Sequence, residues 1–302
     1  MTPALEALCE IIARHSPSGT SHPIPNVMFR SGRGEDDAFT AVLDPMLCFI
    51  LQGSKRIVIG NQDLTFGANS VLALSLRLPV RGRMIDGTVS HPHLGMAVTL
   101  DPDVIAELLL DLPDALPVEV PSFSVTEMEA TMTEPLLRLA RLADHPDDAR
   151  VLGPMAIREI VYRAIRGPVG PLLYDYARRD GRTAQVRRAV DWILTHLDER
   201  IDIDALAALA GMSVRTFHRS FKLLTAHSPV QFVKQARLYK ARNALRGGQG
   251  SVAQVAFDVG YESASQFSRE YTRQFGHPPI KDLAQLLPGP SAAADLKTTQ
   301  PV

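Results

Sequence analysis

The sequence predicts a two-domain α+β protein, with an antiparallel β domain first and an all-α domain in the last third. Short apolar runs separated by glycines fill residues 46–100, which is typical of an antiparallel sandwich or small barrel. After residue 181 the apolar side chains follow helical spacing, and two segments there repeat each other. The charge changes sign between the two parts, which also indicates two domains with different partners.

The overall net charge of −1 is an average of two unlike regions. Residues 1–180 hold 16 basic and 23 acidic side chains, a net charge of −7. Residues 181–287 hold 15 basic and 9 acidic side chains, a net charge of +6. A basic region joined to an acidic one indicates a module that binds a polyanion such as nucleic acid.

Composition excludes several classes of protein. With 302 residues, 45% hydrophobic and 22% charged, the chain has the size and composition of two globular domains. No run reaches the roughly 18 apolar residues of a membrane helix, and residues 1–18 lack a signal-peptide layout. The only cysteines, Cys9 and Cys48, favour a reduced, cytoplasmic setting without a disulfide framework.

The β region has one helical run before it, Ala4–Arg14, in an otherwise irregular stretch of about 40 residues. The predicted strands are Met46–Gln52, Ser54–Ile59, Leu64–Phe66, Ser70–Leu76, Met84–Val89 and Leu94–Leu100. Glycines at 53, 60, 67 and 87 separate them and predict turns.

Helical signals follow the strands. Asp101 and Pro102 predict a helix start, because Asp caps a helix well and Pro is tolerated in its first turn. Pro113–Pro121 is expected to be a loop, and helical spacing resumes at Glu134. Gly-Pro pairs after residue 166 are expected to end this helical region. The tail Pro288–Val302 has a composition typical of disorder.

The last third contains a repeat across about twenty positions. The paired residues are Ala207 and Ala256, Gly211 and Gly260, Ser213 and Ser263, Phe217 and Phe267, Arg219 and Arg269, and Phe221 and Tyr271. In a helix-turn-helix the small Ala lets two helices touch, Gly takes the positive φ of the turn, and Ser caps the second helix. One residue is inserted in the second turn, and a helix over Val230–Arg246 is expected to join the units.

These residues resemble the AraC/XylS family of bacterial transcription regulators over Ile203–Asp282. The matching motifs include Gly211-Met212-Ser213, Ser228-Pro229, Val259-Gly260-Tyr261-Glu262-Ser263 and Phe275-Gly276-His277-Pro278-Pro279. Leu47–Arg56, Leu78-Pro79-Val80 and Arg158–Arg163 resemble the N-terminal domain of one subgroup. The resemblance implies a cupin-like β-barrel, a helical connection suited to dimerisation, and a seven-helix DNA-binding domain. The expected boundaries are 1–130, 131–180 and 181–287, then the tail 288–302, with helix-turn-helix units near 203–224 and 251–274.

The family's pattern places the second helix of each unit in a major groove, where base pairs differ in their donors and acceptors. The residues expected to contact DNA are Arg215, His218, Arg219, Ser265, Gln266 and Arg269. Each has the alternative of being a plain solvated residue, and Arg219 and Arg269 have the further alternatives of a phosphate contact or an internal salt bridge. Lys222, Arg237, Lys240, Arg273 and Lys281 are candidate phosphate contacts or surface charges.

Other chemistry finds little support in the residues. His91 and His93 have the spacing of a cupin metal site, but a third ligand is missing, so no metal and no cofactor is expected. Cys48 and Cys9 are expected to be inert thiols. The run Gly53–Arg56 lacks the glycine pattern of a phosphate loop and is explained by a hairpin turn. No arrangement resembles a catalytic site, so an enzyme is not expected.

The sequence therefore predicts a cytoplasmic, homodimeric transcription regulator, with activation as its assigned direction and repression left open. Its expected partners are double-stranded DNA, RNA polymerase and a small-molecule effector whose pocket residues the sequence does not identify. Two alternatives stay open for the β domain: a cupin-type enzyme fused to a DNA-binding domain, or a module that only dimerises.

Overall fold

The computed structural model describes residues 2–34, 38–88, 90–113 and 120–286. The chain forms two compact units, one of Met1–Trp192 with Ile203–Phe232 and the other of Ile193–Asp202 with Val233–Val302. The first unit therefore contains all the β structure and the first helix-turn-helix, and the second unit contains the second helix-turn-helix. The predicted tail, 288–302, lies outside the described residues.

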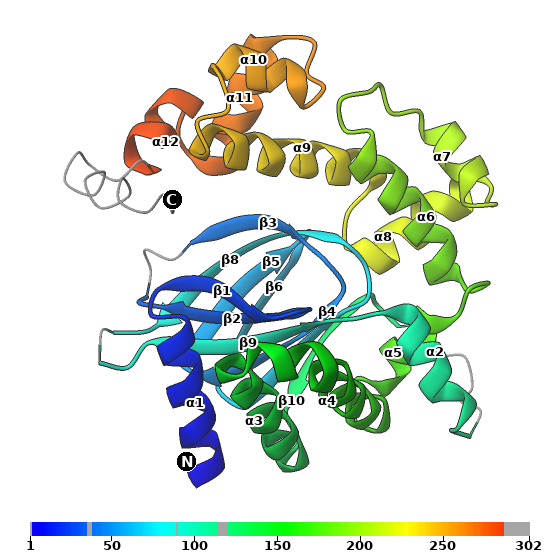
Figure 1. The fold of residues 1–302 in the computed structure, drawn as a ribbon. Coiled ribbons are helices and arrows are strands. Elements are labelled where there is room, and N and C mark those ends of the chain that lie inside the picture. Colours follow the sequence, from blue (N-terminus) through cyan, green and yellow to red (C-terminus); the bar gives the residue numbers. More distant parts are fainter. Residues whose placement is uncertain (1, 35–37, 89, 114–119, 287–302) are drawn as a thin grey trace. The chain divides into compact units, whose positions relative to one another are not determined.

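The β structure consists of two antiparallel sheets in the first unit (Figure 1). The six-stranded sheet has the order β1-β2-β9-β4-β7-β10 and the four-stranded sheet the order β3-β8-β5-β6. The strands are β1 (Gly19–Ile24), β2 (Val27–Gly32), β3 (Phe39–Leu43), β4 (Met46–Gln52), β5 (Ser54–Ile59), β6 (Gln62–Gly67), β7 (Ser70–Leu74), β8 (Leu78–Asp86), β9 (His93–Thr99) and β10 (Phe123–Glu127).

The predicted barrel is not closed, which corrects the sequence-based expectation. The strand β7 pairs with β4 along one edge and with β10 along the other, so neither edge of β7 is left for β6. The strand β6 pairs only with β5 within the described residues and ends the smaller sheet. The N-terminal domain is therefore a pair of open sheets, and β10, which the sequence did not indicate, forms one edge of the larger sheet.

Side chains of the six-stranded sheet alternate between its two faces. In β4, Leu47, Phe49 and Leu51 join the main hydrophobic core with the helices, whereas Cys48 and Ile50 point to the opposite face of the sheet. Both faces of β4 are buried, which explains why its sequence reads as a continuous apolar run. The core on the helix side includes Phe29 and Met96 from the neighbouring strands.

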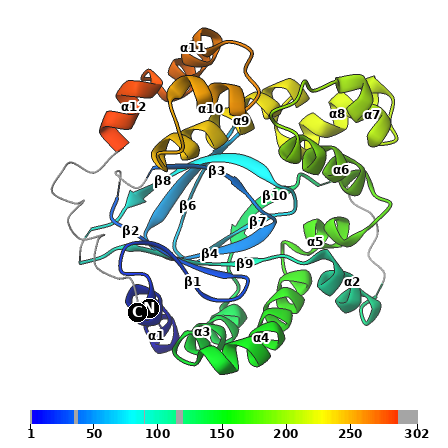
Figure 2. The ribbon, with the colours of Figure 1, turned by 45° about the horizontal axis from the view of Figure 1, so that its top comes forward.

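Helices α1, α3 and α4 line one face of the six-stranded sheet (Figure 1), and α2 lies beside α5 (Figure 2). The elements outside the last third are α1 (Pro3–His15), α2 (Pro102–Leu110), η1 (Ala130–Met132), α3 (Thr133–Arg141), η2 (Leu142–Asp144), α4 (Pro146–Arg166) and α5 (Gly170–Ala177). The predicted Asp101 cap is confirmed, because its side chain accepts a 2.8 Å hydrogen bond from the backbone N–H of Asp103.

One expectation about this region was wrong. Residues 19–32 form β1 and β2 rather than an irregular segment, although Pro23 and Asn26 lower their strand propensity. The helix α4 begins at Pro146, since a proline fits the first helical turn. It ends at Arg166 with Gly167 as its cap, as the first Gly-Pro pair predicts, whereas Gly170 and Pro171 begin a further helix, α5.

The last third contains seven helices among the residues described, as the sequence predicts. They are α6 (Arg182–Thr195), α7 (Ile203–Leu209), α8 (Val214–Thr225), α9 (Pro229–Arg246), α10 (Val252–Asp258), α11 (Ala264–Phe275) and α12 (Pro279–Leu286). Helices α10 to α12 pack around the second half of α9 through a core that includes Leu238, Val255, Phe267 and Tyr271.

A buried ion pair ties α12 to this core. Arg242 on α9 donates two hydrogen bonds, of 2.9 and 3.0 Å, to the carboxylate of Asp282 on α12. The hydroxyl of Tyr271 on α11 donates a third, of 2.6 Å, to the same carboxylate. Asp282 is only 4% exposed, so its carboxylate oxygens depend on these donors for hydrogen bonds. One carboxylate thus joins three helices.

We expect Asp282→Ala to lower the free energy of unfolding by roughly 3–5 kcal/mol, because it leaves the Arg242 guanidinium, whose side chain is only 16% exposed, without its carboxylate partner. Chemical denaturation of the full chain measures this loss. The matched control is Asp63→Ala, which removes an exposed carboxylate paired with Arg56 and should have a much smaller effect. Equal losses in the two variants would contradict the role of Asp282.

Candidate functional site

The first helix-turn-helix consists of α7 and α8. Ala207 is buried where the two helices meet, and Gly211 has the expected positive φ of +66°. The backbone N–H of Met212 donates to the carbonyl of Ala207 and closes the turn. Ser213 then caps α8 by accepting a 3.3 Å hydrogen bond from the backbone N–H of Thr216. The predicted roles of the small, glycine and hydroxyl residues are thus confirmed in this unit.

One face of α8 is buried and the other is open to solvent. Phe217 and Phe221 are fully buried, with their ring centroids 5.3 Å apart, as expected for core residues. Arg215, His218 and Arg219 are exposed on the other side of the helix. Among the residues that the structure describes, none of these three forms an ion pair, so the internal salt bridge considered for Arg219 is absent there. Their contacts to DNA stay a prediction.

The second helix-turn-helix, α10 and α11, repeats this construction. Ala256 is buried, Gly260 has a φ of +89°, and Ser263 accepts a 3.4 Å hydrogen bond from the backbone N–H of Gln266. Phe267 and Tyr271 are buried in the core of the second unit.

The exposed face of α11 carries Ser265, Gln266 and Arg269. No ion pair involves Arg269 in the described part of the chain. The structure therefore brings the three predicted residues of each unit onto one exposed helix face. The two sets belong to different compact units.

Glu270 is a functional candidate that the sequence analysis missed. Its carboxylate accepts a 2.9 Å hydrogen bond from the Tyr261 hydroxyl and lies 3.0 Å from the Lys234 ammonium. Burial alone would raise the pKa of Glu270, but hydrogen bonds from Lys234, Tyr261 and the Gln266 side chain hold it below its usual value. Gln266 is thereby oriented by a charged neighbour one turn away. The i, i+4 spacing of Gln266 and Glu270 was the signal available in the sequence.

Arg237 was considered as a phosphate contact, but its guanidinium is engaged inside the second unit. It donates hydrogen bonds of 2.8 Å to the carbonyl of Leu197 and 2.6 Å to the carbonyl of Glu199. Burial lowers the pKa of Arg237. These contacts hold the segment after α6 in place and favour a structural role. Lys222, Lys240, Arg273 and Lys281 are exposed, as phosphate contacts must be.

The β domain contacts α8 within the first unit. The buried hydroxyl of Ser122 donates a 2.5 Å hydrogen bond to the carbonyl of Leu224 in the last turn of α8. At the turn between β5 and β6, Gly60 packs so closely on Ala226, which ends α8, that a Cβ there would lie 2.1 Å from the Ala226 oxygen. The carboxyl end of α8 therefore packs against the β domain.

The histidines and thiols of the β domain have unlike environments. His91 is exposed, whereas His93 is 1% exposed and faces the interior between the sheets. Burial, together with the charges of Lys55 and Arg30, lowers the pKa of His93 to about 3. No three His, Cys, Asp or Glu side chains gather as a metal site among the residues described. Burial and the neighbouring Glu10 raise the pKa of Cys9 to about 11, so this thiol stays protonated.

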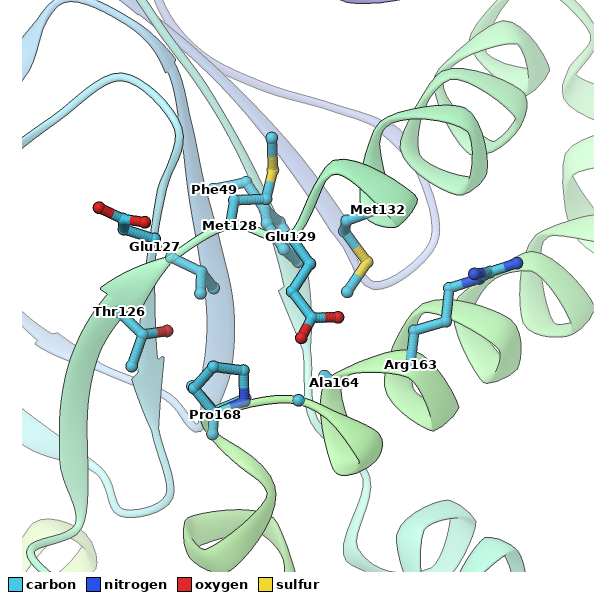
Figure 3. Close-up of a pocket in the computed structure, with 12 residues that line it drawn as sticks. Phe49, Thr126, Glu127, Met128, Glu129, Met132, Arg163, Ala164 and Pro168 are labelled. Atoms are coloured by element: carbon cyan, nitrogen blue, oxygen red, sulfur yellow. The ribbon is translucent and has the colours of Figure 1, made fainter.

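A small cavity lies on the helix side of the six-stranded sheet (Figure 3). Glu129 points between Met132 and Pro168, while Arg163 turns away and pairs with Glu159 at 2.9 Å. The cavity volume is only about 20 Å³, which is room for about one water molecule. It is therefore too small to hold an organic effector.

Two family models match the chain. The "AraC-type transcriptional regulator N-terminus" model matches residues 23–172, and a "Helix-turn-helix domain" model matches residues 206–285. This chain belongs to the AraC/XylS family. The two matches fall on the β domain with its helices and on the pair of helix-turn-helix units, respectively.

Relatives and solved structures agree with this assignment. The chain is 28% identical over 184 residues to the HTH-type transcriptional activator RhaS of Salmonella paratyphi A, a match that covers 59% of this chain and 64% of RhaS. The chain thus spans less than two thirds of that relative. An apo ToxT variant from Vibrio cholerae has a TM-score of 0.58 at 11% identity, covering 89% of this chain and 100% of ToxT.

ToxT from the same organism with an unsaturated fatty acid bound has a TM-score of 0.55 at 12% identity, covering 85% of this chain and 94% of ToxT. At these identities the ToxT structures show a shared two-domain fold.

No helix in the described part of the chain is long and apolar enough to cross a membrane.

The two turn glycines of this AraC/XylS chain offer a matched pair of variants. Gly211→Ala should destabilise the protein by about 1–2 kcal/mol, because alanine at positive φ is strained. Gly260→Ala should cost clearly more, since its Cβ would also lie 2.4 Å from the Leu197 carbonyl oxygen. Chemical denaturation of both variants measures the difference. An equal effect would show that the close approach to Leu197 is unimportant.

Proposed function

We propose that this chain is a sequence-specific DNA-binding transcription regulator whose β domain binds a small-molecule effector. The observation that carries the proposal is the pair of helix-turn-helix units, each with an exposed recognition face on a fully buried aromatic core. Family membership supports it, and the net charge of +6 over residues 181–287 suits a polyanionic partner. A cytoplasmic location is part of the proposal, because the chromosomal DNA that the protein would bind lies there.

Activation is the direction that we include in the proposal. RhaS is named a transcriptional activator, and an activator acts through RNA polymerase, which is therefore the proposed protein partner. The effector is supported by the shared fold of ToxT, one structure of which contains an unsaturated fatty acid. An enzymatic β domain has no comparable support, because the family models describe regulators.

A homodimer through α4 is part of the proposal. Four large apolar side chains are exposed on this helix: Val151 at 68%, Leu152 at 45%, Met155 at 67% and Tyr162 at 42%. Val151, Met155 and Tyr162 are spaced by four and seven residues, so they share one helix face. An exposed apolar stripe of this kind is typical of a protein–protein interface.

For DNA binding, Arg219→Ala tests the first recognition helix. We expect it to weaken binding to the cognate site by roughly 1–3 kcal/mol and binding to random DNA much less, because a guanidinium can bond guanine at two atoms. Genome-wide mapping of bound sites supplies the cognate fragment, and fluorescence anisotropy measures both affinities. Lys222→Ala is the control from the same helix, and it should weaken both equally. An equal loss for Arg219→Ala on both fragments would make Arg219 a phosphate contact.

For assembly, Met155→Asp should convert the dimer to a monomer, because a carboxylate at the centre of an apolar interface is costly to desolvate. Analytical ultracentrifugation of the full chain measures the oligomeric state, and far-ultraviolet circular dichroism confirms the fold. Leu110→Asp is the matched control, since Leu110 is 86% exposed on a different helix, α2. A dimer that persists in Met155→Asp would refute the α4 interface.

A further inference from the structure

The carboxylate of Glu270 lies on α11, one turn after Gln266 and on the same side of the helix. Its Oε1 lies 3.0 Å from the Lys234 ammonium of α9, and its Oε2 accepts a 2.9 Å hydrogen bond from the Tyr261 hydroxyl. The Gln266 side chain donates a further hydrogen bond to the same carboxylate. A carboxylate accepts up to about four hydrogen bonds, so these three donors do not compete for it.

All three neighbours meet Glu270 as donors. Burial opposes the charge of Glu270, but the hydrogen bonds from its neighbours hold its pKa below the usual value. Burial and the Glu270 carboxylate raise the pKa of Tyr261, so this hydroxyl stays protonated and continues to donate. An ionised carboxylate can only accept hydrogen bonds. It therefore attracts the amide nitrogen of Gln266 and repels the amide oxygen.

This polarity decides which atoms Gln266 presents to a partner. Gln266 is exposed on α11, whereas Tyr261 is buried and the Glu270 side chain is only 21% exposed. An unrestrained glutamine exchanges its amide oxygen and nitrogen by a half turn and so presents either arrangement. Beside Glu270, one N–H is engaged by the carboxylate. The amide oxygen and the second N–H are left for a partner.

An acceptor next to a donor matches one base edge in the major groove. Adenine offers a donor at N6 next to an acceptor at N7, whereas guanine offers acceptors at both O6 and N7. We propose that Glu270 is a positioning residue that fixes the Gln266 amide and thereby makes α11 select adenine over guanine at one base pair. The inference rests on the proposed function and deepens it, because it assigns a specificity to the second recognition helix.

The first helix-turn-helix has no equivalent of this arrangement. The offset of 50 residues between the two recognition helices matches Gln266 with Thr216 and Glu270 with Ser220. Ser220 is fully buried and carries no charge, so it cannot fix an exposed side chain of α8 as Glu270 does on α11. Base pairs read by α8 should therefore be unaffected by a change at Glu270, and they serve as an internal control.

The test uses the purified full chain and a randomised DNA duplex library. Sequencing of the selected fragments gives the wild-type site, and Gln266→Ala identifies the base pair that Gln266 reads, because the preference there is lost. We expect the wild type to prefer adenine over guanine at this base pair by about tenfold or more. Glu270→Gln has nearly the same shape without the charge. It should make the two bases nearly equivalent and leave the preferences at other positions unchanged.

Tyr261→Phe is the matched control, because it removes one hydrogen bond from the same carboxylate but leaves its charge and its ion pair with Lys234. It should lower the melting temperature and keep the preference for adenine. Fluorescence anisotropy with the two fragments measures each preference. The proposal is overturned if Glu270→Gln keeps the preference, or if it weakens binding to both fragments equally, which is the result expected of a purely structural residue.

A second measurement needs neither DNA nor a folded Glu270 variant. In the NMR spectrum of the free wild-type chain, the side-chain amide of Gln266 is the signal that disappears in Gln266→Ala. One of its two protons should be shifted downfield and should exchange slowly with solvent, because it is bonded to a carboxylate. A Gln266 signal like those of freely solvated glutamines would overturn the proposal.

Together the two measurements separate this inference from the proposed function. Wild-type protein that selects no sequence refutes the regulator and with it the selection of adenine, while the NMR signal still shows whether Glu270 holds Gln266. Wild-type protein that selects a site in which no preference for adenine depends on Gln266 leaves the regulator intact and refutes the role of Glu270.

Discussion

Both helix-turn-helix units depend on a turn that only a residue with positive φ can make comfortably. Gly211 and Gly260 supply it, and a buried alanine four residues earlier allows the two helices to approach. Once the turn is set, the buried aromatic pair of the second helix determines which side faces outward. The exposed positions of α8 and α11 are therefore consequences of the turn and the core, and their side chains are left to recognise a partner.

In the β domain, the two faces of the six-stranded sheet likewise carry different kinds of side chain. One face of the six-stranded sheet packs against helices through Phe29, Phe49 and Met96 and is wholly apolar at these positions. The other face carries Arg30, Cys48 and His93 toward the smaller sheet. Because side chains alternate along a strand, the stable core and the polar interior do not compete for the same positions. This arrangement lets a charged interior exist beside a conventional core.

The sequence predicted the helix-turn-helix region better than the β domain, for physical reasons. Gly211, Ser213 and Phe217 act through local turn, cap and spacing rules, and these were sufficient to place α7 and α8. The edge strand β10 depends on pairing with β7, some fifty residues away, and no local pattern indicates it. The run Gly53–Arg56 was explained by a hairpin turn. The burial of Lys55 was not predicted, because it follows from the packing of two sheets. Glu270 was missed because its value lies in contacts with Lys234 and Tyr261 from other elements.

The contact between the β domain and α8 constrains how an effector can act. Leu224 and Thr225 at the end of α8 are buried, and Ser122 and Gly60 hold this end, whereas Arg215, His218 and Arg219 remain exposed. The contact therefore leaves these three side chains open to solvent. Under the proposed function, regulation through this contact changes the position or the freedom of α8, and a ligand shifts it only by the difference in its affinity for the two states.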